Sequence, residues 1–252
     1  MSRLSELRQE AEWRKCVRNE TYFLRNYWYI AHPAHGRLLF DLRSAQSEAL
    51  QRWEANRYSL TLKARQIGWT TLVAAHQFWL AFFREEQRMG FSNGSQITSM
   101  PSASDPARGE SATLVVVDEW AFLPNPSEAW ASIEPVADAG GKIIGLSTAN
   151  GSGNFFHHLW VGASTGNNLF NPMFFPWGAS EDRDESWYES KRQSMLPWQL
   201  AQEYPSSAEE AFIKSGNPVF DLDVLQSMEI HIEAGQEGYL HELEPKVLEF
   251  RC

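Results

Sequence analysis

Residues 63–71, with the sequence KARQIGWTT, bring together two cations, a glycine and adjacent hydroxyls. Their spacing follows the phosphate-loop pattern G-x-x-x-x-G-K-S/T, with Gly68 on the second glycine and Thr70 on the hydroxyl. Trp69 stands at the lysine of that pattern, and Lys63 stands at its first glycine. Backbone N–H groups around Gly68, where a helix is expected to start, would hold a phosphate. The segment predicts a phosphate-binding loop whose positive charge has moved to its beginning.

The charge missing at position 69 must come from another side chain if this loop binds phosphate. Lys63 has a stem long enough to fold back over the phosphates, and Arg65 is a second cation in the same segment. Thr70 would supply a hydroxyl ligand for Mg²⁺. The same residues also fit a plain strand end followed by a turn, and their spacing alone does not separate the two interpretations.

An acidic pair, Asp118-Glu119, follows the β-branched run of residues 113–117. A nucleotide hydrolase needs one carboxylate to hold Mg²⁺ and another to orient and polarise the attacking water. Adjacent residues at a strand end can divide these tasks, since one points at the phosphate loop and the other at the space beyond it. Two solvated acids in a loop are the simpler alternative. The order of phosphate loop and acidic pair within one domain favours the catalytic interpretation.

Three further groups of polar residues lie where they could act on a nucleotide. Arg108, on a loop before the acidic pair, could stabilise transition-state charge in its own site or in a neighbour's. Thr148 and Asn150 follow the next strand and could sense the γ-phosphate through hydrogen bonds. Gln46, upstream of the first strand, could recognise an adenine edge. Each group has a plain alternative: a solvated arginine, a turn that contains Asn-Gly, and an exposed helical glutamine.

The elements that would position these residues alternate along the chain. Alternating and β-branched runs predict strands at 57–62, 113–117, 142–146 and 173–177, and a hairpin at 89–100. Helical periodicity predicts helices at 3–18, 39–55, 70–84, 128–137, 154–162, 185–195 and 197–203. This order predicts an α/β domain with a mostly parallel sheet, whose ligands bind beyond the carboxyl ends of the strands. The run at 113–117 is typical of a strand buried on both faces.

The composition is that of a folded soluble protein. Of 252 residues, 43% are hydrophobic and 21% are charged, and the net charge of −10 argues against coating nucleic acid by bulk attraction. A local basic groove remains compatible with that charge. Cys16 and Cys252 form neither a disulfide framework nor a metal cluster. The charged N-terminus is not a secretory signal, and the longest apolar run is too short for a bilayer, so we expect an intracellular protein without membrane contact.

The ordered series of motifs resembles the ATPase domain of the phage terminase large subunit. The resemblance runs from about residue 23 to residue 221 and rests on eight segments in order: 63–71, 93–95, 108–109, 115–122, 147–151, 202–205, 209–212 and 215–216. No single motif is decisive, but the series is specific. It implies a P-loop NTPase fold of the ASCE type and a motor that uses ATP and Mg²⁺ to drive double-stranded DNA into a procapsid.

The resemblance also implies a role for each matching residue. The variant phosphate loop, with its early lysine, would supply the ATP-binding residues Lys63, Arg65, Gln66, Gly68, Thr70 and Thr71. Asp118 would hold Mg²⁺ together with Thr70, and Glu119 would be catalytic. Thr148 and Asn150 would couple hydrolysis to movement. Gln46 would contact adenine, and Arg108 would be an arginine finger that acts on a neighbour in a ring.

Partners and location follow from the same resemblance. It implies contact with a portal or procapsid and with a small terminase subunit, a homo-oligomeric ring, and the host-cell cytoplasm. We expect three regions: an N-terminal helical segment on the adenine side (1–56), a P-loop ATPase core (57–178), and a C-terminal helical subdomain or linker (179–252).

Two departures from the family pattern affect the expected function. Only residues 84–88 lie between Phe83 and the predicted hairpin, too few for the strand–helix unit that such terminases carry there. The expected sheet is therefore one strand short. Residues 221–252 are too few for the family's nuclease domain, so we do not expect cleavage of DNA.

Two other functions remain open from the sequence. A decayed prophage protein could keep the fold and bind nucleotide or a partner without turnover, as the missing strand–helix unit suggests. Another P-loop translocase, such as a helicase, is the weaker alternative, because no second motor repeat follows.

Overall fold

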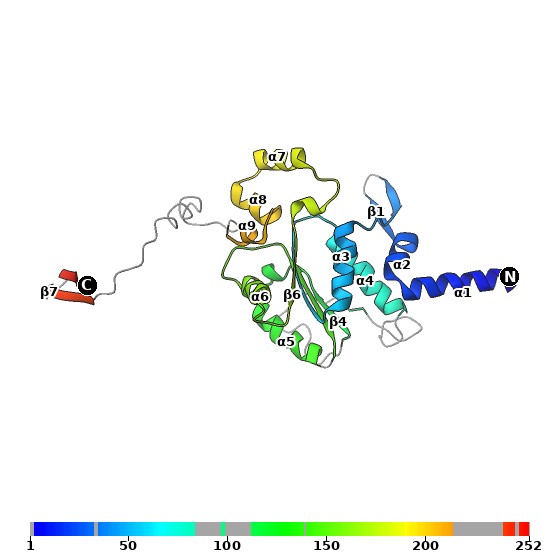
Figure 1. The fold of residues 1–252 in the computed structure, drawn as a ribbon, viewed down its shortest axis with the longest axis horizontal. Coiled ribbons are helices and arrows are strands. Elements are labelled where there is room, and N and C mark those ends of the chain that lie inside the picture. The colour runs from blue at the N-terminus through cyan, green and yellow to red at the C-terminus, as the bar shows by residue number, and fades with distance from the viewer. Residues whose placement is uncertain are drawn as a thin grey trace. The chain divides into compact units, whose positions relative to one another are not determined.

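Figure 1 shows a computed structural model of the chain, which describes residues 3–32, 35–83, 97–98, 112–138, 140–213, 239–244 and 247–251. The chain divides into two compact units, Met1–Asn217 and Pro218–Cys252. In the second unit, strands β7 (Tyr239–Glu244) and β8 (Val247–Arg251) pair in antiparallel fashion. Most of the predicted hairpin at 89–100 and the loop that carries Arg108 lie outside the described residues.

The first unit is built on a four-stranded parallel sheet. Its strands are β3 (Tyr58–Lys63), β4 (Leu114–Val117), β5 (Lys142–Ser147) and β6 (Asn171–Phe175), in the spatial order β4-β5-β3-β6. Every neighbouring pair is parallel. This sheet confirms the predicted α/β class. Because β5 lies between β3 and β4, the strand that leads into the candidate phosphate loop and the strand that leads into the acidic pair are separated by one additional strand.

Helices cover both faces of this sheet (Figure 1). Helices α3 (Ser44–Ala55) and α4 (Trp69–Phe83) share one hydrophobic cluster with α2 (Glu20–Tyr27). Helices α5 (Pro126–Asp138), α6 (Phe155–Ser164) and α9 (Ala208–Ile213) contribute to a second cluster on the other face. The remaining elements are α1 (Arg3–Arg18), the hairpin β1 (Tyr29–His32) and β2 (Gly36–Leu39), the 3₁₀ turns η1 (Trp120–Phe122) and η2 (Trp177–Ala179), α7 (Glu185–Ser194) and α8 (Pro197–Glu203).

The period-two alternation of strands explains how one sheet serves two clusters. In β5, Ile144 and Leu146 belong to the cluster of α3 and α4, whereas Ile143 belongs to that of α5 and α6. Strand β4 corrects the expectation of a strand buried on both faces, since Leu114, Val115 and Val116 are only half-buried. Among the described strands β4 lies at the edge of the sheet and pairs on one side, with β5. The β-branched run therefore predicted a strand correctly, but it did not predict that the strand lies at the edge of the sheet.

Two predicted boundaries were wrong for local reasons. The helix expected from residue 39 begins at Ser44, because Leu39 still belongs to β2 and Arg43 is extended, with φ −69° and ψ 158°. The strand expected through residue 177 ends at Phe175, and Pro176 follows it. A proline lacks the N–H that a continued ladder would use. The helices α2 and α9 and the strands β1, β2, β7 and β8 were not predicted.

Helix α4 is anchored at several points of the core. The His76 Nδ1 lies 2.8 Å from the Glu20 Oε1, and both side chains are largely buried, which ties α4 to α2. The indole N–H of Trp79 donates to the backbone carbonyl of Cys16 at 2.9 Å. None of the described helices combines the length and the apolar character that crossing a bilayer demands.

We predict that Gly145→Ala destabilises the first unit, because β5 has no room for a side chain at this position. A Cβ there would lie 2.4 Å from Trp120 Cε3 and 3.1 Å from Leu60 Cδ1. Overpacking of this kind costs about 1–3 kcal/mol in the free energy of unfolding. Urea unfolding followed by circular dichroism measures it. Gly178→Ala is the matched control, since a Cβ at Gly178 meets no atom within 4 Å. Equal unfolding midpoints for the two variants would contradict the packing argument.

Candidate phosphate-binding site

The loop that joins β3 to α4 has a backbone shape that ordinary residues adopt at a cost. Gln66 has φ 57° and Gly68 has φ 81°, both in the left-handed region. A Cβ at Gly68 would also lie 2.9 Å from the side-chain nitrogen of Gln46. The dihedral angle therefore favours glycine at position 68, and a side chain there would also displace the end of the Gln46 side chain.

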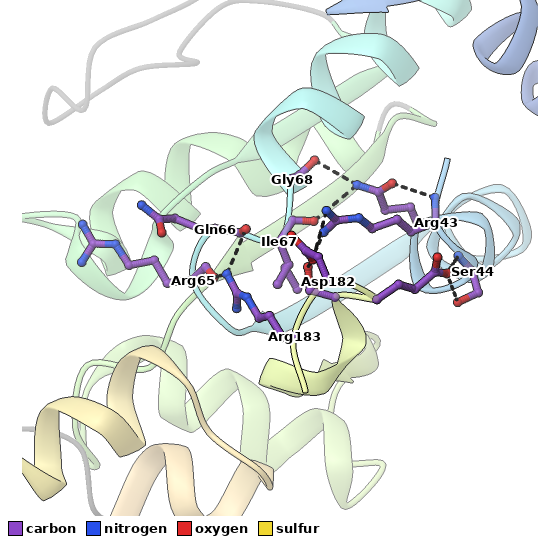
Figure 2. Close-up of polar contacts among 11 residues, drawn as sticks. Arg43, Ser44, Arg65, Gln66, Ile67, Gly68, Asp182 and Arg183 are labelled. Atoms are coloured by element: carbon purple, nitrogen blue, oxygen red, sulfur yellow. Dashed lines mark hydrogen bonds and ion pairs between the residues drawn. The ribbon is translucent and has the colours of Figure 1, made fainter. Parts of the chain in front are cut away.

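Side chains from two other elements hold the carbonyl groups of this loop. The Nη2 of Arg183 donates to the carbonyl oxygens of Arg65 and Gln66, at 2.9 and 3.1 Å. The Nε2 of Gln46 lies within hydrogen-bond distance of the carbonyls of Ile67 and Gly68, at 3.4 and 3.2 Å. These contacts are visible in Figure 2 around the labelled loop residues. Four consecutive carbonyl groups, from residue 65 to residue 68, are thus engaged by side chains.

The opposite side of these peptide groups carries N–H donors. In a trans peptide, the N–H of one residue points away from the carbonyl of the residue before it. The N–H groups of residues 66–69 therefore point away from the side chains that hold the carbonyls. Among the hydrogen bonds of the described residues, none has the N–H of Gln66, Gly68 or Trp69 as its donor, whereas the turn at residues 65–66 directs the Ile67 N–H toward the Ala64 carbonyl. With the N-terminus of α4 adjacent, this arrangement is suited to an anion such as phosphate.

Trp69, at the lysine position of the standard pattern, belongs to the hydrophobic core. Its side chain is 2% exposed and its ring lies 5.7 Å from that of Trp53 and 4.6 Å from that of Phe175. The residue anchors the first turn of α4 against α3 and β6. A charge in this orientation would be buried among aromatic rings, so the cation of the site must come from elsewhere.

Lys63 is the cation that the structure places nearest to the acidic pair. Its side chain is 6% exposed, and its Nζ donates to the Glu119 Oε1 at 2.9 Å. Glu119 itself is 51% exposed and adopts a left-handed backbone conformation with φ 50°. The contact spans β5, which lies between the strands that lead into the two residues. A nearly buried ammonium is thereby paired with a carboxylate that reaches solvent.

A second contact joins the phosphate loop to the acidic pair. The Thr70 hydroxyl donates to the Asp118 Oδ2 at 3.2 Å, and the Asp118 Oδ1 accepts from the Glu119 N–H at 2.9 Å. The structure thus brings together Lys63, Thr70, Asp118 and Glu119, which the sequence had placed on two separated motifs.

The segment after β5 supports the backbone that follows the acidic pair. The Ser147 hydroxyl accepts from the Ala121 N–H at 3.1 Å, and the Asn150 side chain donates to the Ala121 carbonyl at 3.0 Å. Thr148 is buried, at 4% exposed. Asn154 in turn donates to the Asn150 carbonyl at 2.7 Å. Asn150 therefore links the end of β5 to η1, directly after Glu119.

The other predicted residues are distributed around the loop. Arg65 is 58% exposed, and its Nη1 lies 3.1 Å from the Glu203 Oε2, a partner that raises the pKa of the guanidinium. Gln66 is exposed and Thr71 is half-buried. Arg108 lies outside the described residues.

Gln46 differs from the exposed helical glutamine that its position in the sequence suggested. It is 3% exposed, its Oε1 accepts from the Arg43 N–H at 3.1 Å, and its Nε2 faces the loop carbonyls. Its amide supports the loop backbone, and its contact with adenine stays a prediction.

Sequence reasoning missed Arg183. It lies in a polar stretch without periodicity, 118 residues after the loop residue whose carbonyl it holds. The one available signal was its type, because a guanidinium carries five N–H donors and can bond to several carbonyl groups.

The donor set around the loop fits a nucleoside triphosphate with Mg²⁺. Unpaired N–H groups suit phosphate oxygens, and a hydroxyl beside a carboxylate suits a magnesium ion that takes its other ligands from phosphate and water. No cluster of three or more metal-binding side chains occurs among the described residues.

Solved structures with a similar fold include phage large terminases. The large terminase of the thermophilic bacteriophage D6E matches with a TM-score of 0.45 and 10% identity, over 62% of this chain and 51% of that one. The ATPase domain of the large terminase of Thermus phage P74-26 matches with a TM-score of 0.36 and 17% identity, over 64% of this chain and 80% of that one. A single-residue mutant of that domain matches with a TM-score of 0.40 and 15% identity, over 67% and 83%.

These values describe a likeness of fold at low identity. The chain spans about half of the length of the D6E protein. No family model matches the chain. The function must therefore be argued from the site itself.

We predict that Glu119→Gln destabilises the protein in the absence of ligands, because it leaves the buried Lys63 ammonium without its partner. Since Glu119 is half-exposed and water can reach the pair, we expect a loss of about 1–2 kcal/mol, less than for a fully buried pair. Guanidinium unfolding of the single variants and of the Lys63→Met/Glu119→Gln double variant measures the coupling.

The double variant should lose less stability than the sum of the two single variants. Glu189→Gln serves as control, because Glu189 pairs with Arg192 at 3.5 Å on an exposed surface of α7. Strict additivity at Lys63 and Glu119 would show that the pair contributes no net stability.

Proposed function

We propose that this chain hydrolyses ATP as the motor domain of a viral DNA-packaging terminase large subunit. One observation carries the proposal: a loop with free N–H groups faces an acidic pair to which its own Lys63 and Thr70 are already bonded. The order of the motifs along the chain supports the narrower assignment to a terminase. The motor would translocate double-stranded DNA into a procapsid.

The loop residues would bind the triphosphate. The N–H groups of residues 66–69 would hold phosphate oxygens, and Lys63 would offset their charge. Thr70 and Asp118 would hold Mg²⁺, which supplies positive charge to the phosphates when bound. Arg65, Gln66 and Thr71 complete the proposed binding set, and Gln46 would contact the adenine.

Glu119 would then be released for catalysis. In the structure its carboxylate is occupied by the Lys63 ammonium. Phosphate oxygens compete for that ammonium, so nucleotide binding would free the carboxylate to orient a water molecule and accept its proton. The exposed position of Glu119 gives such a water access. This order of events couples substrate binding to the appearance of the catalytic base.

Other residues would act through neighbours or partners. Thr148 and Asn150 would relay changes at Glu119 to the body of the domain, a role that the Asn150–Ala121 hydrogen bond supports. Arg108 would act as an arginine finger, in an assembled ring of identical subunits. The portal or procapsid, a small terminase subunit and double-stranded DNA are the proposed partners, in the host cytoplasm.

The proposed regions keep the boundaries expected from the sequence. Residues 1–56 support the adenine side, 57–178 form the ATPase core, and 179–252 form a helical subdomain or linker. No nuclease activity is assigned to this chain.

We predict that the purified chain hydrolyses ATP in the presence of Mg²⁺ and that duplex DNA stimulates the rate. Glu119→Gln should lower the rate at saturating ATP by roughly 100-fold or more while nucleotide binding persists, because it removes the base. Lys63→Ala should weaken nucleotide binding by about tenfold or more, through loss of a charge-assisted contact. Phosphate release and calorimetric titration with ADP measure these effects.

Glu189→Gln is the matched control for the first variant, because it makes the same chemical change on an exposed face of α7. If the wild-type chain binds nucleotide but does not hydrolyse it, the motor function is wrong. The alternative, a prophage protein that binds nucleotide without turnover, then takes its place. Full turnover in Glu119→Gln would remove Glu119 from the catalytic role.

A further inference from the structure

Arg183 reaches the phosphate loop from a distant part of the chain. It belongs to residues 180–184, which join η2 to α7 and which we call the strap. Its Nη2 donates to the carbonyls of Arg65 and Gln66. Figure 2 shows the Arg183 guanidinium beside these two loop residues. Its Nη1 is buried and has no hydrogen-bond partner within the described part of the chain, so the loop carbonyls are the polar contacts that hold it.

Aromatic rings fix the position of this guanidinium. It lies 4.5 Å from the centre of the Trp187 ring on α7 and 5.2 Å from that of Tyr204, which follows α8. Burial lowers the pKa of the Arg183 guanidinium, which nevertheless remains charged at neutral pH. A planar cation stacked on rings has few conformations left, so little entropy is lost when it bonds to the loop.

The strap that carries Arg183 is itself fastened to α3. Arg43, at the start of α3, donates to the Ser180 hydroxyl and lies 3.3 Å from Asp182. The Ser44 hydroxyl lies 3.3 Å from the Glu181 carboxylate. The strap is therefore fastened at Arg43 and Ser44, and the Arg183 side chain is held by the rings of Trp187 on α7 and of Tyr204 after α8.

These contacts determine which way the loop N–H groups point. Each carbonyl that Arg183 holds fixes the opposite N–H of the next residue, since both belong to one planar peptide. Arg183 thus orients the N–H groups of Gln66 and Ile67. Gln66 is in the left-handed region, which a residue with a side chain leaves readily when nothing holds it. Rotation of either peptide would turn a carbonyl oxygen toward the place where phosphate oxygens bind.

We propose that Arg183 is a positioning residue that presets the Gln66 and Ile67 N–H groups for the phosphates of a nucleotide. The proposal rests on the proposed function of the loop but concerns its preorganisation and not the chemistry of hydrolysis. Arg183 contacts the outside of the loop, so it acts through the backbone and not on the ligand. The strap, α7 and α8 thereby control phosphate affinity from outside the site.

The test compares Arg183→Gln and Arg183→Lys with the wild-type chain. Isothermal titration with inorganic pyrophosphate isolates the phosphate contacts, since this probe has no base or sugar. We expect Arg183→Gln to weaken pyrophosphate binding by about tenfold or more. Arg183→Lys keeps the charge but loses the planar group that lies over the aromatic rings, so it should retain part of the affinity. In the ATPase assay KM should rise while kcat stays within about threefold, because the residue does not touch the reacting atoms.

Arg192→Gln is the matched control. It is the same substitution, arginine to glutamine, at a position on α7 where the side chain is 68% exposed. Thermal unfolding and amide hydrogen exchange at residues 66 and 67 separate loss of the fold from loss of loop order. The proposal expects pyrophosphate to protect these two amides from exchange in the wild-type chain and to protect them less in Arg183→Gln, with the rest of the core unchanged. Binding of pyrophosphate by both Arg183 variants within twofold of the wild type would overturn it, as would a fall in kcat with an unchanged KM.

The two proposals can fail separately. A wild-type chain that binds pyrophosphate in an Arg183-dependent manner but never hydrolyses ATP refutes the motor function and keeps the positioning role. A chain that hydrolyses ATP with the same KM and kcat in Arg183→Gln as in the wild type keeps the function and refutes the positioning role. A wild-type chain that binds neither pyrophosphate nor ADP refutes both.

Discussion

The orientation of four consecutive peptide groups is the constraint on which the candidate site depends. Arg183 and Gln46 engage the carbonyls of residues 65–68, and the N–H groups of residues 66–69 consequently face the other way. A helix N-terminus alone offers such donors in a general direction. Arg183 and Gln46, which lie outside the loop, hold the carbonyl groups and so fix the orientation of the N–H groups. Arg183 holds the carbonyl groups on both sides of Gln66, the residue in the left-handed region.

The position of the cation follows from the packing of α4. Trp69 fills the space between Trp53 and Phe175, which anchors the helix but removes the side chain that a standard phosphate loop would present to its ligand. Lys63 takes over as the cation from the preceding strand. Because its ammonium is nearly buried, it requires an anionic partner at all times. Glu119 is that partner in the structure, and phosphate would be its natural replacement.

In the proposed function, Lys63 would exchange the Glu119 carboxylate for phosphate when a nucleotide binds. In the structure this carboxylate neutralises Lys63, and in the proposed function it would serve as base after a nucleotide binds. Asp118 stays next to Thr70, and Asn150 holds the backbone that follows the pair through Ala121. The chemistry is thereby distributed over β3, β4 and β5, whose carboxyl ends lie side by side in the sheet.

The sequence by itself determined the elements and the residue types of the site. Local periodicity located β3, α4, β4 and β5 to within a residue or two, and the loop spacing singled out Lys63, Gly68 and Thr70. Those properties depend on neighbours in the chain, which a sequence displays directly. The hairpin β1–β2 was missed because its strands are short, and the half-buried state of β4 because burial depends on strand order.

Only the tertiary structure decided which distant groups meet. In the observed strand order β5 lies between β3 and β4. The Lys63 side chain reaches Glu119 across the width of this strand. Gln46 contacts the loop backbone, and so does Arg183, although more than a hundred residues separate Arg183 from the loop in sequence. Neither contact produces a periodic pattern in the sequence. Such contacts arise from how helices and connecting segments pack on the sheet, and packing depends on the whole chain at once. The loop could be recognised from its residues, but what holds it in shape could not.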